Sequence, residues 1–444
     1  MQILLFKDKR LFFHFLQILL ASFGVGLARL LLPFQVVALG GSEAIVSITS
    51  VLYAVGQVLG LLFLARICSR SESAFFIVML MWLSSLLTMI LPFLFAVTIA
   101  RFFEGLGYGL LIIAILNYSD TFFKENKGEA VGTLFGSIFF GGAIGQGLAG
   151  LFEETVFGER TFWIFSPFQI VLLVGVFLAL ISVILSFSFH RRSGAKVFEI
   201  DNIAISHFHL KNLKGLFKFL PFVLLLIIYA FYDFSHGIYT PNLPLVLSSH
   251  GISKIHISLI FFTGDAIWGL AQIFTGKLVD KMGSWIPMAL SMVIKGSGVV
   301  GYNLVNPWIG VLFLFAVVGI GESLMEPARN IAILEMENYF DSELSDNEVL
   351  HEHKHLNISI SRGQGFTFGI HSHTHEHKPS KESMIMGLQL AGILSFGLGG
   401  LVGSSILSLG GTAELLVYIG AGVLIFTSLF AFAEKLYNYK KTQK

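Results

Sequence analysis

Acidic and imidazole side chains occur inside long apolar segments of this chain, where an ionisable group is energetically costly. Asp233 and His236 are spaced i and i+3, so they share one face of a helix. Glu322 and Glu326, spaced i and i+4, also share a face. Asp265 is about 16 Å along the helix axis from the end of its segment, which places it near the middle of a membrane. Because a charge at the bilayer centre costs about 3 kcal/mol, we expect these residues to face a cavity and to have a function.

Two kinds of chemistry fit these side chains. A carboxylate in a low-dielectric cavity keeps its proton to a higher pH than one in water, so it can load and release a proton near neutral pH. Alternatively, the same carboxylates and His236 supply mixed oxygen and nitrogen ligands for a divalent transition metal.

A third interpretation is structural, with basic residues inside the apolar segments pairing with the acids. Arg101 and Glu104, spaced i and i+3, are the first pair expected to do so. Arg29 lies in the outer part of its segment and is expected to extend its charge towards the membrane surface. The residues predicted to handle substrate and protons are Asp233, His236, Asp265, Glu322, Glu326, Arg101, Glu104, Arg29, Tyr229 and Tyr232.

The elements that must position these residues are membrane-spanning helices. The 444 residues are 55% apolar and only 13% charged, far below the roughly 25% charged residues of soluble domains. Apolar runs of about 20 residues, enough to cross a hydrocarbon core, recur along the whole chain. We count twelve, near 11–39, 44–65, 74–92, 95–118, 129–151, 163–188, 219–247, 256–278, 284–304, 307–335, 384–408 and 413–433.

The distribution of charge predicts the orientation. Most of the 29 Lys and Arg residues fall in alternate loops and near both ends of the chain, which favours cytoplasmic termini in a plasma membrane or a bacterial inner membrane. A net charge of +1 gives no reason to expect a nucleic-acid partner. A lone cysteine, Cys68, excludes an internal disulfide and a cysteine-rich metal site.

The chain contains an internal repeat. Leu32–Arg70 and Leu243–Lys281 align without a gap at a constant offset, which pairs Gly40 with Gly251. Such a parallel repeat predicts two similar halves that can rock about a site between them. We assign 1–189 to the first half, 190–217 to a basic cytoplasmic linker and 218–444 to the second half.

The end of the eighth apolar segment, 276–283, reads Gly-Lys-Leu-Val-Asp-Lys-Met-Gly. It resembles the Gly-x-Leu-x-Asp-Arg/Lys-x-Gly signature of the major facilitator superfamily. The first-half copy has Ser69 where that signature has its aspartate. The gate residues that this resemblance assigns are Gly276, Asp280, Lys281, Gly283 and Arg70.

Two further motifs support the resemblance. The stretch 101–107, Arg-Phe-Phe-Glu-Gly-Leu-Gly, resembles the Arg-x-x-x-Gly-x-Gly pattern of the same superfamily. The glycine-rich stretch 141–150 is similar to a helix of its antiporters, with Gln146 where that pattern has proline.

The resemblance implies an all-α integral membrane protein whose twelve helices form two pseudo-symmetric six-helix bundles around a central cavity. It also implies a monomer that moves a small solute with protons by rocker-switch alternating access. Asp280 beside Lys281 is then expected to make a contact between the halves that holds the inner gate closed.

A histidine-rich segment, 338–382, interrupts the second half. We expect it to be cytoplasmic and largely disordered. Alternating histidines share one side of an extended chain, so neighbours can chelate a divalent transition metal, either adventitiously or as a donor or sensor. The predicted metal ligands are His351, His353, His355, His371, His373, His375 and His377.

The same segment contains His-Glu-x-x-His at 351–355, the pattern of zinc proteases. That pattern needs a stable helix, whereas this match lies in a low-complexity tract, so we do not predict an enzyme.

Our leading prediction is a proton-coupled exporter or antiporter of a small solute in the lipid bilayer, with no required cofactor. The alternative is an exporter of Zn, Ni or Co whose histidine-rich segment gathers the ion. A non-transporting metal sensor is a third possibility.

Overall fold

The computed structural model describes residues 8–64, 71–123, 127–157, 166–193, 220–305, 307–344, 351–360, 366–375 and 381–442. Arg70, His377 and most of the predicted linker therefore lie outside the described residues.

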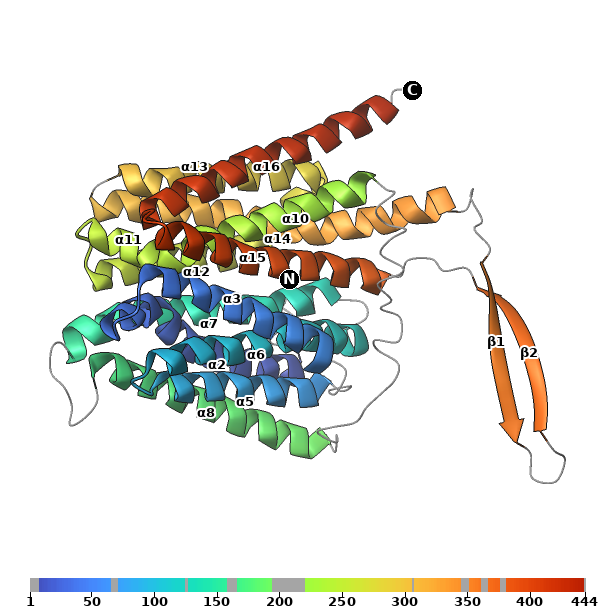
Figure 1. Cartoon of the computed structure of the whole chain (residues 1–444), viewed down its shortest axis with the longest axis horizontal. Helices are drawn as coiled ribbons and strands as arrows, with labels where there is room; N and C mark the ends of the chain where they lie inside the picture. The colour runs from blue at the N-terminus through green and yellow to red at the C-terminus, as the bar shows by residue number, and fades with distance from the viewer. Residues whose placement is uncertain are drawn as a thin grey trace.

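Among the described residues, six long helices form the first half of the chain (Figure 1). They are α2 (Lys9–Ala38), α3 (Glu43–Leu59), α5 (Ser71–Met89), α6 (Leu94–Phe122), α7 (Lys127–Leu151) and α8 (Pro167–Ser193), with the π-helical turns η1 (Gly60–Leu64) and η2 (Phe152–Phe157) continuing α3 and α7. The carboxylate of Asp8 caps the start of α2, because it accepts hydrogen bonds from the backbone N–H groups of Arg10 and Leu11 at 2.7 and 3.0 Å.

The described part of the second half contains six further long helices and one short one. They are α10 (Leu220–Tyr239), α11 (Leu243–Ser249), α12 (Lys254–Met282), α13 (Trp285–Leu304), α14 (Trp308–Leu344), α15 (Lys381–Ser408) and α16 (Ala413–Thr442). The 3-10 turn η3 (Thr240–Asn242) separates α10 from α11, where Pro241 and Pro244 lack the N–H groups that would continue the helix.

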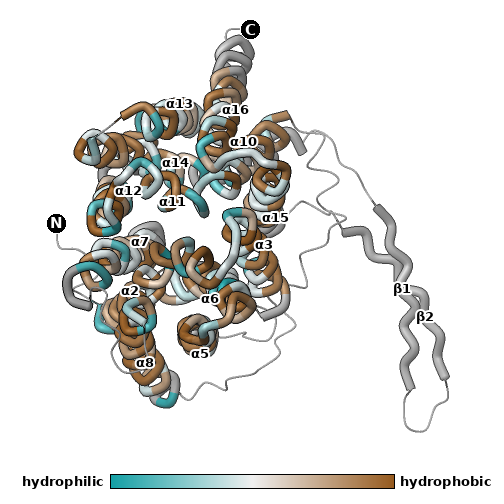
Figure 2. The backbone as a smooth tube through the Cα atoms, turned by 60° about the vertical axis from the view of Figure 1, so that its left-hand side comes forward, coloured by the Kyte–Doolittle hydropathy of each residue, from teal (hydrophilic) through white to brown (hydrophobic). Residues whose placement is uncertain are grey.

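The two halves pack by the same scheme. In the first, α2 contacts α7 and α8, while α5 contacts α6 and α8; in the second, α10 contacts α15 and α16, while α13 contacts α14 and α16. The halves meet where α7 packs on α12 and α3 packs on α15, and Figure 2 shows these pairs side by side. The predicted fold class, twelve helices in two pseudo-symmetric bundles, is confirmed.

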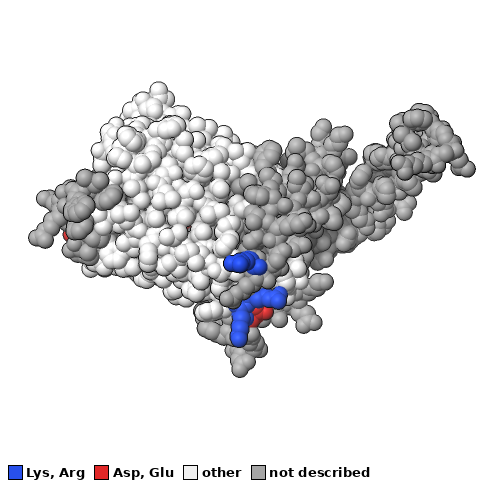
Figure 3. Space-filling model, turned by 90° about the horizontal axis from the view of Figure 1, so that it is seen from below, with Lys and Arg blue, Asp and Glu red and all other residues white. Residues whose placement is uncertain are grey.

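The helices have the length and composition of membrane spans. Within the described ranges, nine are long and apolar enough to cross a membrane, and Ser73–Met89 is a shorter apolar helix. Figure 3 shows a broad face without charged side chains, and the Lys and Arg residues visible there lie along one border of it. Such a face suits contact with acyl chains.

The internal repeat is visible in the backbone. Gly40 ends the turn after α2 with φ +81°, and Gly251 ends the turn after α11 with φ +78°. The following N–H donates to the carbonyl five residues earlier in both copies, from Gly41 to Val36 at 2.9 Å and from Ile252 to Leu247 at 3.3 Å. The left-handed conformation explains the glycine at this position in each copy.

Close packing of α2 on α7 accounts for part of the glycine content. A Cβ atom at Gly145 would overlap the carbonyl oxygen of Phe23, and one at Gly26 would overlap that of Gly142. Small residues let helix backbones approach closely in lipid, where apolar side chains gain nothing by leaving the acyl chains.

The prediction that the histidine-rich segment is largely disordered is wrong for its described part. Strands β1 (His351–Ile360) and β2 (Phe366–His375) pair in an antiparallel hairpin, and α14 continues to Leu344 before it. Apolar residues recur at every second position near the turn, a strand pattern that the charged composition obscured. In an extended strand His351 and His355 are also much farther apart than in the helix on which a zinc protease needs these two ligands.

Candidate functional site

The charged side chains inside the second half are paired. On α14, Glu322 Oε1 lies 2.7 Å from the ammonium of Lys295 on α13 and 2.9 Å from Nε2 of His236 on α10. The Lys295 side chain is fully buried, and its ammonium lies 4.2 Å from the ring centroid of Tyr232. The cluster joins three helices through one buried carboxylate.

A second ion pair lies nearby on the same helices. Arg329 of α14 donates from Nη2 to Asp233 Oδ2 of α10 at 2.8 Å, and from Nη1 to Glu326 Oε1 at 3.2 Å. Its guanidinium carbon lies 3.6 Å from the ring centroid of Tyr229. Glu322 and Glu326, expected to share a face, thus interact with different cations.

The first half holds its own ion pair. Glu104 of α6 accepts a hydrogen bond from Arg29 of α2 at 2.8 Å and another from Arg101, one turn away on α6. The expected pairing of Arg101 with Glu104 is therefore present. Arg29 is held by this buried carboxylate although its side chain is 46% exposed, so the expectation that its charge extends towards the membrane surface stays a prediction.

Asp265 differs from the other acids. Its Oδ2 accepts a hydrogen bond of 2.6 Å from the side-chain amide of Gln146, which joins α12 of the second half to α7 of the first. Glu322, Asp233, Glu326 and Glu104 each have a cation within 4.0 Å, whereas no salt bridge to Asp265 is found among the described residues. Asp265 is thus a half-buried acid whose described hydrogen-bond partner is neutral and belongs to the opposite half.

The clusters interact electrostatically across the interface between the halves. The charge of Arg29 interacts with that of Asp265, and Asp265 in turn interacts with Glu322. The ion pairs of the two halves therefore influence one another through Asp265. The acids Glu104, Asp233, Asp265, Glu322 and Glu326 are together called the acidic network below.

The structure adds partners that the sequence prediction did not include in the site. The sequence gives basic residues inside apolar segments, such as Lys295 and Arg329, only a structural role, and Gln146 stands out in it only as a departure from a motif. Each is a polar residue inside an apolar segment, and this feature of the sequence could have identified it as a residue of the site.

The hypothesis of a metal site among the intramembrane acids has no support here. Among the helical residues whose side chains the structure describes, no group of three or more His, Cys, Asp or Glu side chains is arranged to hold a metal ion. Arg329 and Lys295 hold the carboxylates that would have been ligands.

The gate motif lies at the end of α12. Gly283 follows the last helical residue with φ +74°, so the final glycine of the motif is explained by backbone conformation. Lys281 is exposed. The side chain of Asp280 is outside the described set, so its expected contact between the halves remains a prediction.

Polar contacts join the halves at the end of the bundle opposite the gate motif, which we call the far end. Lys254 of α12 lies 2.7 Å from Glu153 Oε1, and its backbone N–H donates to Glu154 Oε1 at 2.7 Å. Ser258 accepts a hydrogen bond of 2.7 Å from the N–H of Gly150.

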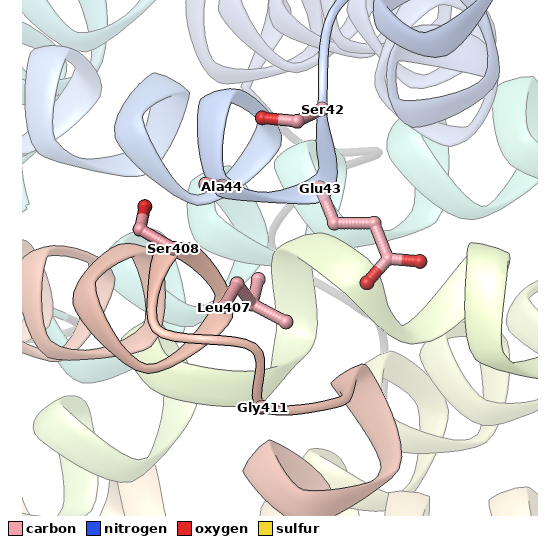
Figure 4. A pocket seen from close by; sticks show the side chains of 6 residues that line it. All are labelled: Ser42, Glu43, Ala44, Leu407, Ser408 and Gly411. Atoms are coloured by element: carbon pink, nitrogen blue, oxygen red, sulfur yellow. The ribbon is translucent and has the colours of Figure 1, made fainter.

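The second interface between the halves has a matching polar contact. Asn242 donates to Ser47 of α3 at 2.7 Å, and Ser47 is the repeat counterpart of Ser258. Beside it, the start of α3 and the turn between α15 and α16 line a pocket of about 290 Å³ (Figure 4). This pocket lies at the far end, away from the acidic network.

Comparison with solved structures shows the same fold. A POT family transporter in complex with a thioalcohol-conjugated peptide has a TM-score of 0.64 at 13% identity, with 97% of this chain and 96% of that chain covered. A POT family transporter in complex with 5-aminolevulinic acid gives 0.62 at 13% identity, with 96% of each chain covered. A peptide transporter POT in complex with alafosfalin gives 0.61 at 13% identity, with 96% and 94% covered.

A search of curated protein sequences finds no significant match. The family model described as Major Facilitator Superfamily matches residues 15–336, which include every residue of the acidic network. The chain therefore belongs to the Major Facilitator Superfamily of membrane transporters.

Proposed function

We propose that the chain is a proton-coupled secondary active transporter that exports a small solute by alternating access, in exchange for protons. The hydrogen bond between Asp265 and Gln146 carries this proposal, because it joins an acid in one half to a neutral donor in the other. A carboxylate that is partly withdrawn from water without a neighbouring cation is unfavourable, so we infer that the acid enters this closed contact with its proton.

Rocking of the halves then couples the proton to the solute. When α7 and α12 separate, Asp265 loses its amide donor and meets water, where the ionised form is stable. The proton is released on that side, and the amino group of a solute takes its place beside the carboxylate, so the halves close again with the solute bound. The acid regains a proton only after the site has opened to the opposite side and the solute has left. The charges of Arg29 and Glu322 interact with that of Asp265. A solute that binds beside either residue can therefore alter the protonation of Asp265.

The charged network supports a polar substrate. Cations and anions from both halves lie around the interface, so a solute that carries amino and acidic groups can replace existing ion-pair partners. The complexes of similar fold with a peptide conjugate and with 5-aminolevulinic acid are consistent with this class. An apolar drug, which the high aromatic content also suits, would desolvate these ion pairs without offering them a polar partner.

The direction and orientation of transport rest on sequence patterns. Exchange is supported by the likeness of 141–150 to antiporter helices, and cytoplasmic termini by the Lys and Arg distribution. With that orientation, the hairpin is cytoplasmic and the far end is the outer end, where polar contacts join the halves. Zn, Ni or Co export remains the alternative prediction.

Transport by inside-out vesicles under an imposed pH gradient tests the proposal. A panel of labelled dipeptides, amino acids, cationic dyes and Zn²⁺ is offered to the wild type and to Asp265→Asn. We expect the wild type to accumulate one of the polar organic solutes, while Asp265→Asn retains exchange of labelled for unlabelled solute but loses accumulation driven by the gradient. Asp8→Asn serves as the control, because asparagine also caps a helix.

Wild-type pH dependence of transport in Asp265→Asn would contradict the role of this acid. Accumulation of Zn²⁺ alone would favour the metal exporter instead.

A further inference from the structure

The register of the β1–β2 hairpin brings histidines together in pairs. The strands run antiparallel, with Ser359 opposite Thr367 near the turn. Three register positions pair histidine with histidine, namely His351 with His375, His353 with His373 and His355 with His371. These three consecutive pairs are called the histidine ladder below.

All six residues of the histidine ladder occupy one face of the hairpin. Alternate positions along a strand lie on the same face, and residues directly opposite in an antiparallel pair also share a face. The neighbours Glu352 and Lys354 fall on the other face, opposite Thr374 and Ser372. The histidine face therefore combines imidazoles with no carboxylate or ammonium group.

Residue pairs on both faces of the hairpin favour this register. Near the turn, the face opposite the histidines carries three apolar pairs, Leu356 with Ile370, Ile358 with Phe368 and Ile360 with Phe366. A slip by one residue would break the apolar pairs and the histidine pairs together. Cross-strand aromatic and β-branched pairs each contribute roughly 0.2–1 kcal/mol, which favours the observed alignment.

We propose that the histidine ladder is a binding site for divalent transition-metal ions, with Zn²⁺ as the representative ion. Opposite residues have Cβ atoms about 4.5–5.5 Å apart, and a Zn–N bond is about 2.0–2.1 Å long, so two imidazoles across the strands can share one ion. Two consecutive pairs supply four nitrogen ligands, the number of a tetrahedral site. Mg²⁺ and Ca²⁺ prefer oxygen ligands and do not suit this face.

The site is independent of the proposed transport function, because it lies outside the helices and uses none of the acidic network. It also differs from a polyhistidine tract, in which only the number of histidines matters. In the histidine ladder, affinity depends on which histidines are opposite one another. That difference is open to a test that leaves the amino-acid composition unchanged.

The test uses the full-length protein in detergent, purified with a tag that contains no histidine, and Zn²⁺ titration against a chromogenic chelator. The starting variant replaces His351, His355, His371, His375 and His377 with glutamine, so that His353 and His373 remain as one opposite pair. H353K/K354H then exchanges two neighbours on β1 and moves one histidine to the other face. Adding S372H/H373S makes the same exchange at the opposite positions of β2.

We expect the wild type to bind Zn²⁺ with micromolar or tighter affinity and to show no competition from Mg²⁺ or Ca²⁺. The exchange on β1 alone should weaken binding by the starting variant at least tenfold. The exchange on both strands should return the affinity to within threefold, because it pairs the histidines again on the other face. Unchanged affinity after the first exchange, or no Zn²⁺ binding by the wild type, would overturn the proposal.

Discussion

At the scale of single residues, the acids of the network differ in the partner that each carboxylate contacts. Glu322 has a fully buried ammonium beside it, and Asp233 shares an arginine with Glu326. Asp265 is held by a neutral amide from the other half. Neutralising an acid therefore has different consequences at the two positions. Glu322→Gln leaves a buried cation without a counter-charge, whereas Asp265→Asn keeps an oxygen that can accept the hydrogen bond from Gln146.

Glu322→Gln is expected to destabilise the protein strongly, because it leaves Lys295 buried without a counter-charge. Removing one partner of a buried ion pair costs about 3–5 kcal/mol. Glu326→Gln is the matched control on α14, since Arg329 keeps its contact with Asp233 and Glu326 is partly exposed. We expect the control to cost less than about 1 kcal/mol. Thermal unfolding in detergent measures both.

The double variant K295M/E322Q checks the cause. It removes both charges, so we expect it to recover most of the stability that Glu322→Gln loses. A double variant as unstable as the single one would contradict the ion-pair explanation.

At the scale of helices, α7 has two roles. One side of it packs on α2 through glycines, and the other meets α12 at the interface between the halves. The close packing fixes α7 within its own half, so that movement occurs between α7 and α12. Gln146 is carried on this fixed helix, which sets the position of the amide that Asp265 accepts.

Gly145→Ala is expected to cost about 1–3 kcal/mol of stability, because overpacking forces backbone shifts. The added Cβ would overlap the backbone of Phe23 and Leu27 on α2. Gly136→Ala is the control on the same helix, since a Cβ there has nothing within 4 Å. Because alanine is a better helix former than glycine, Gly136→Ala should leave the stability of the protein unchanged or slightly higher. Equal loss in both variants, measured by thermal unfolding, would argue against glycine packing.

At the scale of the whole molecule, the halves are joined at the far end by Lys254, Ser258 and Asn242. Ser258 and the partner of Asn242, Ser47, are counterparts in the repeat. Each interface between the halves therefore has a polar contact at an equivalent position. Breaking these contacts is the step that opening at the far end requires.

Lys254→Gln is expected to shift the population towards a form open at the far end. A partly exposed ion pair contributes about 0.5–1 kcal/mol, which corresponds to a change of about two- to fivefold. The readout is labelling of an Ala54→Cys probe by a membrane-impermeant thiol reagent, in a Cys68→Ser background. Ala54 is buried between the halves, beside Gly397. We expect labelling to become faster by that factor.

Two controls complete this experiment. Lys9→Gln removes an exposed lysine of α2 and should leave the labelling rate unchanged. E153K/K254E reverses the far-end ion pair and should restore slow labelling. Fast labelling in the reversed pair would show that the ion pair does not hold the halves together.

The sequence by itself determined the membrane-spanning helices, the twofold repeat and the family. Each depends on local or periodic properties, namely apolar length, glycine in a left-handed turn, and a short motif at a helix end. The paired positive φ angles at Gly40 and Gly251 illustrate this, because backbone conformation at a turn depends on the residues beside it. The same reasoning found the intramembrane acids, since an ionisable group in an apolar segment is visible in the sequence.

Only the tertiary structure decided which residues these acids meet. Lys295 lies 27 positions from Glu322, and Gln146 lies 119 positions from Asp265, so no spacing rule connects them. The histidine pairs are a similar case, because alternation showed that histidines share a face but only strand pairing put them opposite one another. Side-chain partners are set by how helices and strands pack, and packing brings together residues that are far apart in the chain.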